Sequence, residues 1–196
     1  MNPKPAVLMI ASGVCWLVGA LAFAPLLSDV YAAEGAARQA AIARHLAPWI
    51  AQNLLFFAGV VAAAFGLSRL VTCVGGRGHR IAKSGRVILW LAVTAWTILF
   101  YALIATPLGV PYAGRIVTRT FWMWAAFTTL AAFVMIGLSL IASRAAIFAG
   151  AWMAVASALL FCAVIAMRTT LPPAIFFQVL LVAGVALIVR KPVLCV

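Results

Sequence analysis

Few side chains in this sequence could transfer a proton or hold a metal ion, because its 196 residues include only two acidic residues and two histidines. Asp29, Glu34 and His45 share one polar segment, whereas His79 lies in another. A histidine beside a carboxylate can act as a general acid and base, and it could activate a nucleophile within hydrogen-bond reach. An enzyme that uses His45 is therefore one functional hypothesis.

The long apolar runs of the sequence contain no aspartate, glutamate, histidine or lysine. Ionisable side chains within a membrane usually mark function. Their absence argues against a carboxylate relay for protons or cations, a retinal Schiff base, haem held by histidines and a di-metal carboxylate site. The four cysteines form no C-x-x-C pair and no metal-ligand spacing. We expect neither a metal nor another cofactor.

The composition is that of a membrane protein. Hydrophobic residues make up 68% of the chain and charged residues 8%, whereas about 25% of the residues of a soluble domain are charged. The net charge of +12 comes from Lys and Arg residues scattered over all the gaps between apolar runs. Nucleic-acid binding needs a basic patch on one folded face, so we expect no nucleic-acid partner.

Six apolar runs are long enough, or nearly so, to cross a bilayer as helices. We expect a single transmembrane domain, an all-α polytopic bundle of six transmembrane helices plus an interfacial helix in the first extracytoplasmic loop. The expected spans are residues 6–27, 50–74, 87–108, 121–141, 145–167 and 173–189.

The expected interfacial helix covers about residues 29–47. Ser28 and Asp29 suit a helix start, and the alanine-rich stretch that follows has high helix propensity, interrupted by Gly35. We expect Ile42, Leu46 and Trp49 to face the membrane.

The Lys and Arg bias sets the orientation. With both termini in the cytoplasm, nine Lys and Arg residues lie inside and five outside, and both acidic residues lie outside. We expect a multi-pass protein of a bacterial inner membrane with cytoplasmic N- and C-termini.

The stretch "GGRGHRIAKSGR", residues 75–86, matches neither a Walker loop nor a dinucleotide-binding fingerprint, because the required glycines are missing. We interpret it as a loop that sets topology and contacts anionic lipids on the cytoplasmic side. The expected lipid contacts are Arg77, Arg80, Lys83 and Arg86.

Neutral polar and aromatic residues gather in the outer halves of the spans. They could line a cavity for an amphiphilic molecule, or they could be interfacial anchors and hydrogen bonds between helices. The candidate ligand-binding residues are Gln52, Asn53, Tyr101, Trp122, Trp124, Thr128 and Gln178.

Small residues form stripes along two spans and predict close helix packing. The stripes leave open whether they close the core of this chain or contact another subunit, in a homo-oligomer or a larger complex. They comprise Gly59, Ala63 and Gly66 in the second span and Ala146, Gly150, Ala154 and Ala158 in the fifth.

The segment "HLAPWIAQNLLFFAGVVAAAFGLSRL", residues 45–70, resembles six-helix bacterial membrane proteins of uncharacterised activity. In that pattern a surface helix ends in a tryptophan, a polar pair opens the second span, and glycines follow along one face. The resemblance implies the six-helix architecture and no particular activity.

Our leading functional hypothesis is a non-enzymatic membrane protein that binds a lipid-like or amphiphilic molecule in its outer half, or that is an accessory subunit of a membrane complex. Membrane lipids, anionic ones included, are the expected partners. The first alternative is a facilitator or exporter of a neutral or amphiphilic solute. The second alternative is the enzyme that uses His45.

Overall fold

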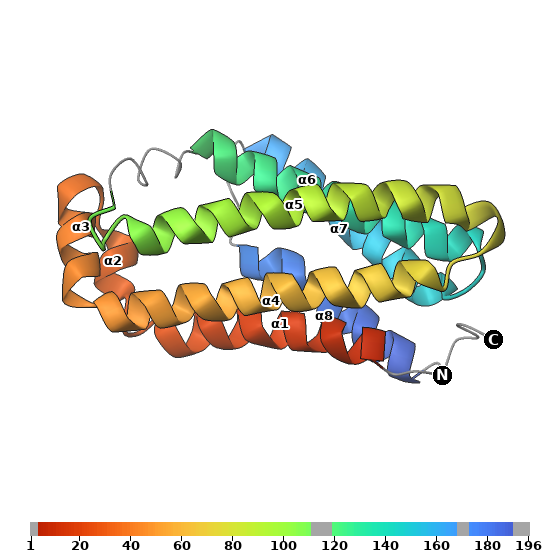
Figure 1. Ribbon diagram of the computed structural model, residues 1–196, viewed down its shortest axis with the longest axis horizontal. Helices are drawn as coiled ribbons and strands as arrows, with labels where there is room; N and C mark the ends of the chain where they lie inside the picture. Colours follow the sequence, from red (N-terminus) through yellow and green to blue (C-terminus); the bar gives the residue numbers. More distant parts are fainter. Residues whose placement is uncertain (1–3, 111–118, 168–172, 190–196) are drawn as a thin grey trace.

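The computed structural model (Figure 1) describes residues 4–110, 119–167 and 173–189. These parts of the chain form helices joined by turns and short loops, and they contain no strand. In chain order the helices are α1 (Lys4–Phe23), α2 (Ser28–Ala32), α3 (Gly35–Arg44), α4 (Leu46–Thr72), the 3-10 turn η1 (Gly76–Gly78), α5 (His79–Ala105), α6 (Arg119–Ala142), α7 (Ile147–Met167) and α8 (Pro173–Val189).

The six long helices form a closed ring. In order around the ring, α1 packs on α4, α4 on α5, α5 on α6, α6 on α7, α7 on α8, and α8 on α1 again. The short helices α2 and α3 lie together at one end of this ring, on the left of Figure 1, and we call it the capped end. The opposite end, where η1 joins α4 to α5, is called the basic end.

Five of the described helices are long and apolar enough to cross a membrane: α1, α4, α5 with η1, α6 and α7. The sixth, α8, is equally apolar but has 17 residues, so it spans about 25 Å of a hydrocarbon core about 30 Å thick. Large apolar side chains cover the outside of the ring, and Leu21 and Leu159 are 67% and 66% exposed. Such a surface fits a membrane protein.

Small residues bring neighbouring helices into backbone contact. A Cβ atom added to Gly150 on α7 would lie 2.6 Å from the carbonyl oxygen of Gly137 on α6, and Gly66 on α4 faces the backbone of α1. Of the other residues in the two stripes, Ala63, Ala146 and Ala154 are buried, whereas Ala158 is exposed. These contacts all lie within the chain.

Aromatic rings fill the middle of the bundle. The indole of Trp16 on α1 is stacked between Phe56 on α4 and Phe177 on α8, with ring centroids 4.3 and 4.6 Å apart. Trp96 on α5 stacks on Phe100 at 5.6 Å. These rings come from four helices, so the aromatic layer ties the ring together across its centre.

The interfacial segment differs from the prediction. Ala33 and Glu34 are extended and separate α2 from α3, and Gly35 begins α3 with a φ of +55°, which glycine adopts at little cost. The expected orientation is wrong for Ile42 and Trp49, which are each 4% exposed because they pack with Leu27 and Val30 on the bundle instead of facing lipid.

The helices after this segment also begin earlier than predicted. α4 starts at Leu46 instead of residue 50, and α5 starts at His79 instead of residue 87. Arg80, Lys83 and Arg86 therefore lie on the first turns of a helix and not in a loop. Arginine and lysine are good helix formers, so their charge marks a polar surface without ending the helix.

Candidate functional site

A cavity of about 710 Å³ lies inside the ring at the capped end. Its described lining comes from α1, α2, α3, α4, α5, α6 and α8 and from the residues just after α5. The lining residues are Trp16, Ala20, Tyr31, Arg38, Gln39, Ile42, Trp49, Gln52, Asn53, Phe56, Phe100, Leu103, Thr106, Pro107, Arg119, Trp122, Pro173 and Ala174.

The described part of α8 stops short of the capped end. The 27-residue helices α4 and α5 are each about 40 Å long, against about 25 Å for α8. Figure 1 shows α8 beginning well short of the capped end. Pro173 and Ala174, at the start of its described part, line the cavity.

The inner end of the cavity is an aromatic floor made of Trp16, Phe56 and Phe100. Two glycines make room for it: a Cβ atom at Gly59 would lie 2.7 Å from the Trp16 ring, and one at Gly19 would overlap the Phe56 ring. Below the floor, Trp96 and Phe177 continue the aromatic layer. This layer closes the inner end of the cavity with apolar surface.

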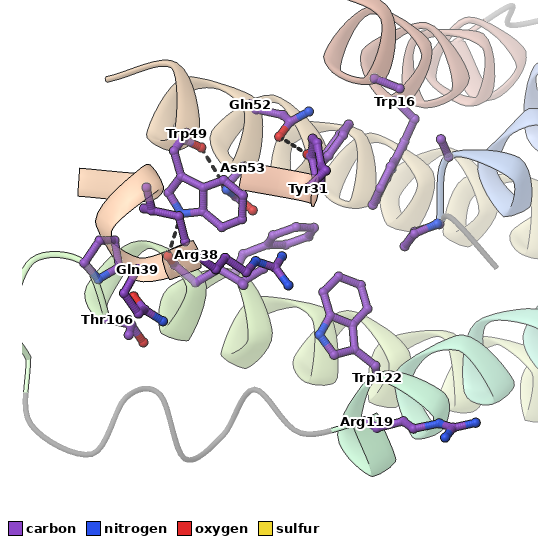
Figure 2. A pocket seen from close by; sticks show the side chains of 18 residues that line it. Trp16, Tyr31, Arg38, Gln39, Trp49, Gln52, Asn53, Thr106, Arg119 and Trp122 are labelled. Carbon is purple, nitrogen blue, oxygen red and sulfur yellow. Dashed lines mark hydrogen bonds between the residues drawn. The ribbon is translucent and has the colours of Figure 1, made fainter. Parts of the chain in front are cut away.

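Gln52 is the polar centre of the cavity wall (Figure 2). It is 2% exposed, it accepts a 2.5 Å hydrogen bond from the Tyr31 hydroxyl, and its amide nitrogen donates to the Gly19 carbonyl at 2.9 Å. A buried amide needs such partners. Its hydrogen bonds therefore join α4 to α2 and α1.

Asn53 is the next residue on α4, and its side-chain amide uses its nitrogen but not its oxygen in hydrogen bonds with the described residues. Its amide nitrogen donates to the Trp49 carbonyl at 2.8 Å, and the Trp49 indole donates to the Leu103 carbonyl at 2.9 Å. Within the described part of the chain, the amide oxygen of Asn53 has no hydrogen-bond partner. It is an acceptor available to a hydroxyl or amine in the cavity.

The charged residues of the described lining are both arginines, Arg38 on α3 and Arg119 at the start of α6. In Figure 2 the Arg38 side chain extends inward from α3 toward Trp122, whereas that of Arg119 points away from Arg38. Neither of the two acidic residues of the sequence lines the cavity. The field inside is therefore positive.

Burial raises the pKa of the Tyr31 hydroxyl, and this effect outweighs the hydrogen bond with Gln52 and the nearby charge of Arg38, which both act to lower the pKa. The phenol is therefore neutral at physiological pH and remains a hydrogen-bond donor.

Three of the seven predicted ligand-binding residues line the cavity: Gln52, Asn53 and Trp122. The remaining four lie elsewhere. Tyr101 and Trp124 are 60% and 45% exposed on the outside, Thr128 donates to the carbonyl of Trp124 on its own helix, and Gln178 donates to the Gly13 carbonyl, which ties α8 to α1.

Sequence reasoning missed Trp16, Tyr31, Arg38 and Arg119 as lining residues. The pattern that could have identified Arg38 is its place four residues before Ile42, on the same face of the helix. Once Ile42 packs on the bundle, the residue one turn before it, Arg38, also lies over the bundle.

The predicted anionic-lipid contacts lie at the basic end. Arg77 is in η1 and Arg80, Lys83 and Arg86 are on α5, and all four are exposed. Arg86 also lines a shallow groove beside Phe65 and Trp90. These residues are remote from the cavity.

His45 and Asp29 do lie together, with Nε2 and Oδ2 3.2 Å apart, and Arg44 approaches the same carboxylate oxygen at 3.4 Å. None of the three lines the cavity. They form a partly exposed cluster that links α2 to the junction of α3 and α4. The described residues contain no group of three or more histidine, cysteine or acidic side chains that could hold a metal ion.

The sequence matches no protein-family model, and comparisons with curated proteins and with solved structures give no match. The site must therefore be interpreted from its own geometry.

Proposed function

We propose that this protein binds an amphiphilic, lipid-like molecule in the cavity at the capped end. The observation that carries the proposal is the composition of the cavity, with an aromatic floor at one end and amides and arginines at the other. Pockets for small molecules occupy about 300–1,000 Å³ and are mostly apolar with a few polar groups. A molecule with an apolar tail and a polar head matches both ends.

In this proposal the chain is an integral protein of a bacterial inner membrane with six transmembrane helices, α8 included, and with α2 and α3 at the outer interface. The described basic residues support this orientation. Lys4, Arg69, Arg77, Arg80, Lys83, Arg86 and Arg144 lie toward the basic end, and Arg38, Arg44 and Arg119 toward the capped end. By the positive-inside rule the basic end is cytoplasmic.

The aromatic layer favours a ligand-binding protein over a facilitator that moves a solute across the membrane. A facilitator needs a route for its solute across the bundle, whereas Trp16, Phe56 and Phe177 stack tightly in its centre. The proposal therefore places a resident or exchanging ligand in the outer half. An accessory subunit would use the same cavity to hold a lipid beside its partner.

Native mass spectrometry of the protein extracted in a mild detergent tests this proposal, because it reports bound lipids and bound subunits together. We expect one lipid-sized ligand per chain. Ala20→Phe, which places a ring in the cavity, should remove it, whereas Ala22→Phe, on the exposed face of the same helix, should retain it. Equal ligand occupancy in the two variants would contradict the proposal.

A further inference from the structure

We infer that the polar head of the ligand is anionic and that Arg38 binds it. The inference rests on the proposed function and adds the chemical class of the ligand, a membrane lipid with a phosphate head group. Its phosphate lies against the Arg38 guanidinium, and its apolar chains lie on the aromatic floor.

The distribution of carboxylates is the first argument. Asp29 is within 3.4 Å of Arg44 and within 3.2 Å of His45, and Glu34 does not line the cavity. Arg38 therefore has no carboxylate partner among the described residues, although it lies over an apolar cavity. An anion that enters the cavity gains a charge-assisted hydrogen bond, which is about twice as strong as a neutral one.

The neutral polar groups of the wall are the second argument, because most of them are already occupied. Gln52 and Tyr31 bond to each other, Gln52 also donates to a backbone carbonyl, and the Trp49 indole donates to Leu103. Of the two arginines in the described lining, Arg119 points away from Arg38 in Figure 2, so the guanidinium directed over the cavity is that of Arg38. Its planar donors match the oxygens of a phosphate.

The position of Arg38 is the third argument. Figure 2 shows its side chain reaching from α3 toward Trp122. A ligand with its phosphate there has its apolar end directed at Trp16 and Phe100. Because α3 closes this end of the ring, the same helix that covers the cavity also carries the charge.

Of the two molecules that could bring a phosphate to Arg38, a lipid and free phosphate, the lipid fits this arrangement. Free phosphate would leave the aromatic floor without a partner, whereas a lipid covers the floor and the arginine together. Exposed apolar side chains on the outside of the ring, such as Leu21 and Leu159, place the bundle among lipids.

The test measures lipid selectivity by native mass spectrometry after the protein is mixed with equal amounts of phosphatidylglycerol and phosphatidylcholine in detergent. Ala20→Phe gives the background from lipids bound outside the cavity. Both lipids carry a phosphate, but the choline cation of phosphatidylcholine offsets its charge, so for the cavity-bound lipid we expect wild-type protein to prefer the anionic phosphatidylglycerol about tenfold. Arg38→Gln should reduce this ratio to near one while lipid remains bound.

Arg44→Gln is the matched control, because Arg44 lies on the same helix but does not line the cavity. It should keep the wild-type ratio, and added inorganic phosphate should not displace the lipid. Equal binding of the two lipids by wild-type protein, an unchanged ratio in Arg38→Gln, or displacement by phosphate would overturn the inference and leave the proposed function standing. Loss of the difference between Ala20→Phe and wild type would instead overturn the proposed function.

Discussion

At the residue scale, Tyr31 links the cap to the cavity wall. Its hydroxyl donates to Gln52, and Gln52 donates in turn to the Gly19 carbonyl, so a chain of hydrogen bonds joins α2, α4 and α1. Gln52 is 2% exposed. Removing its partner would leave a buried acceptor without a hydrogen bond, which is costly.

Tyr31→Phe should therefore lower the free energy of unfolding by about 1–2 kcal/mol, measured as a lower Tm in detergent at neutral pH. Tyr101→Phe is the control, because Tyr101 is 60% exposed. An unchanged Tm in Tyr31→Phe would show that the hydrogen bond does not hold the cap.

The pH dependence of stability gives a second measurement. Because burial raises the pKa of Tyr31, folding favours the neutral phenol. The stability that the neutral phenol of Tyr31 contributes is fully present below about pH 10, and it is lost as the pH rises through the pKa of Tyr31 in the folded state. Between pH 10 and that pKa, wild-type protein should lose more stability than Tyr31→Phe does.

The sequence predicts some of the residues that line this site and misplaces others, and the reason is physical. Gln52 and Asn53 stand at the border of an apolar run, where a polar pair needs partners inside the protein. Counting residues gives the depth of a side chain along a span, but its direction depends on which neighbour the helix packs against. Tyr101 and Trp124 share the half of the bundle near the capped end with Gln52, yet they are exposed on its outside.

At the element scale, the contact between α6 and α7 depends on two glycines. A Cβ atom at Gly150 would lie 2.6 Å from the Gly137 carbonyl oxygen, which belongs to the backbone and cannot rotate away. We expect Gly150→Ala to separate the two helices and to lower the free energy of unfolding by about 1–3 kcal/mol.

Thermal unfolding in detergent measures this effect, and Ala158→Val on the same helix provides the control. Ala158 belongs to the same predicted stripe but is exposed, so its substitution should leave the Tm almost unchanged. A larger loss in Ala158→Val than in Gly150→Ala would place the important surface of α7 outside the chain, against a partner subunit.

Residue types predict helix boundaries only approximately. Pro173, the first residue of the described part of α8, is of a type that suits a helix start. The start of α5 was missed by eight residues, since charged side chains mark the edge of a membrane and do not interrupt helical hydrogen bonds. The break at Ala33 and Glu34 lies directly before Gly35, the residue of low helix propensity at which the sequence indicates an interruption.

At the scale of the whole molecule, the two ends differ in charge and in construction. The capped end carries both acidic residues, one of them paired with Arg44 and His45. The basic end carries exposed arginines and a lysine on η1 and the start of α5 without an acidic residue beside them. A membrane with an anionic cytoplasmic leaflet therefore favours one orientation of the bundle over the other.

Cysteine labelling in intact cells tests this orientation. In a background with the four native cysteines replaced by serine, Ala36→Cys places an exposed thiol on α3 and Ser84→Cys places one on the first turns of α5. A membrane-impermeant maleimide should label the first and not the second, and permeabilisation should expose both. Neither substitution changes the net charge, so the positive-inside balance is preserved. Labelling of Ser84→Cys alone would reverse the topology. The cavity would then open toward the cytoplasm, and its ligand would come from the inner leaflet.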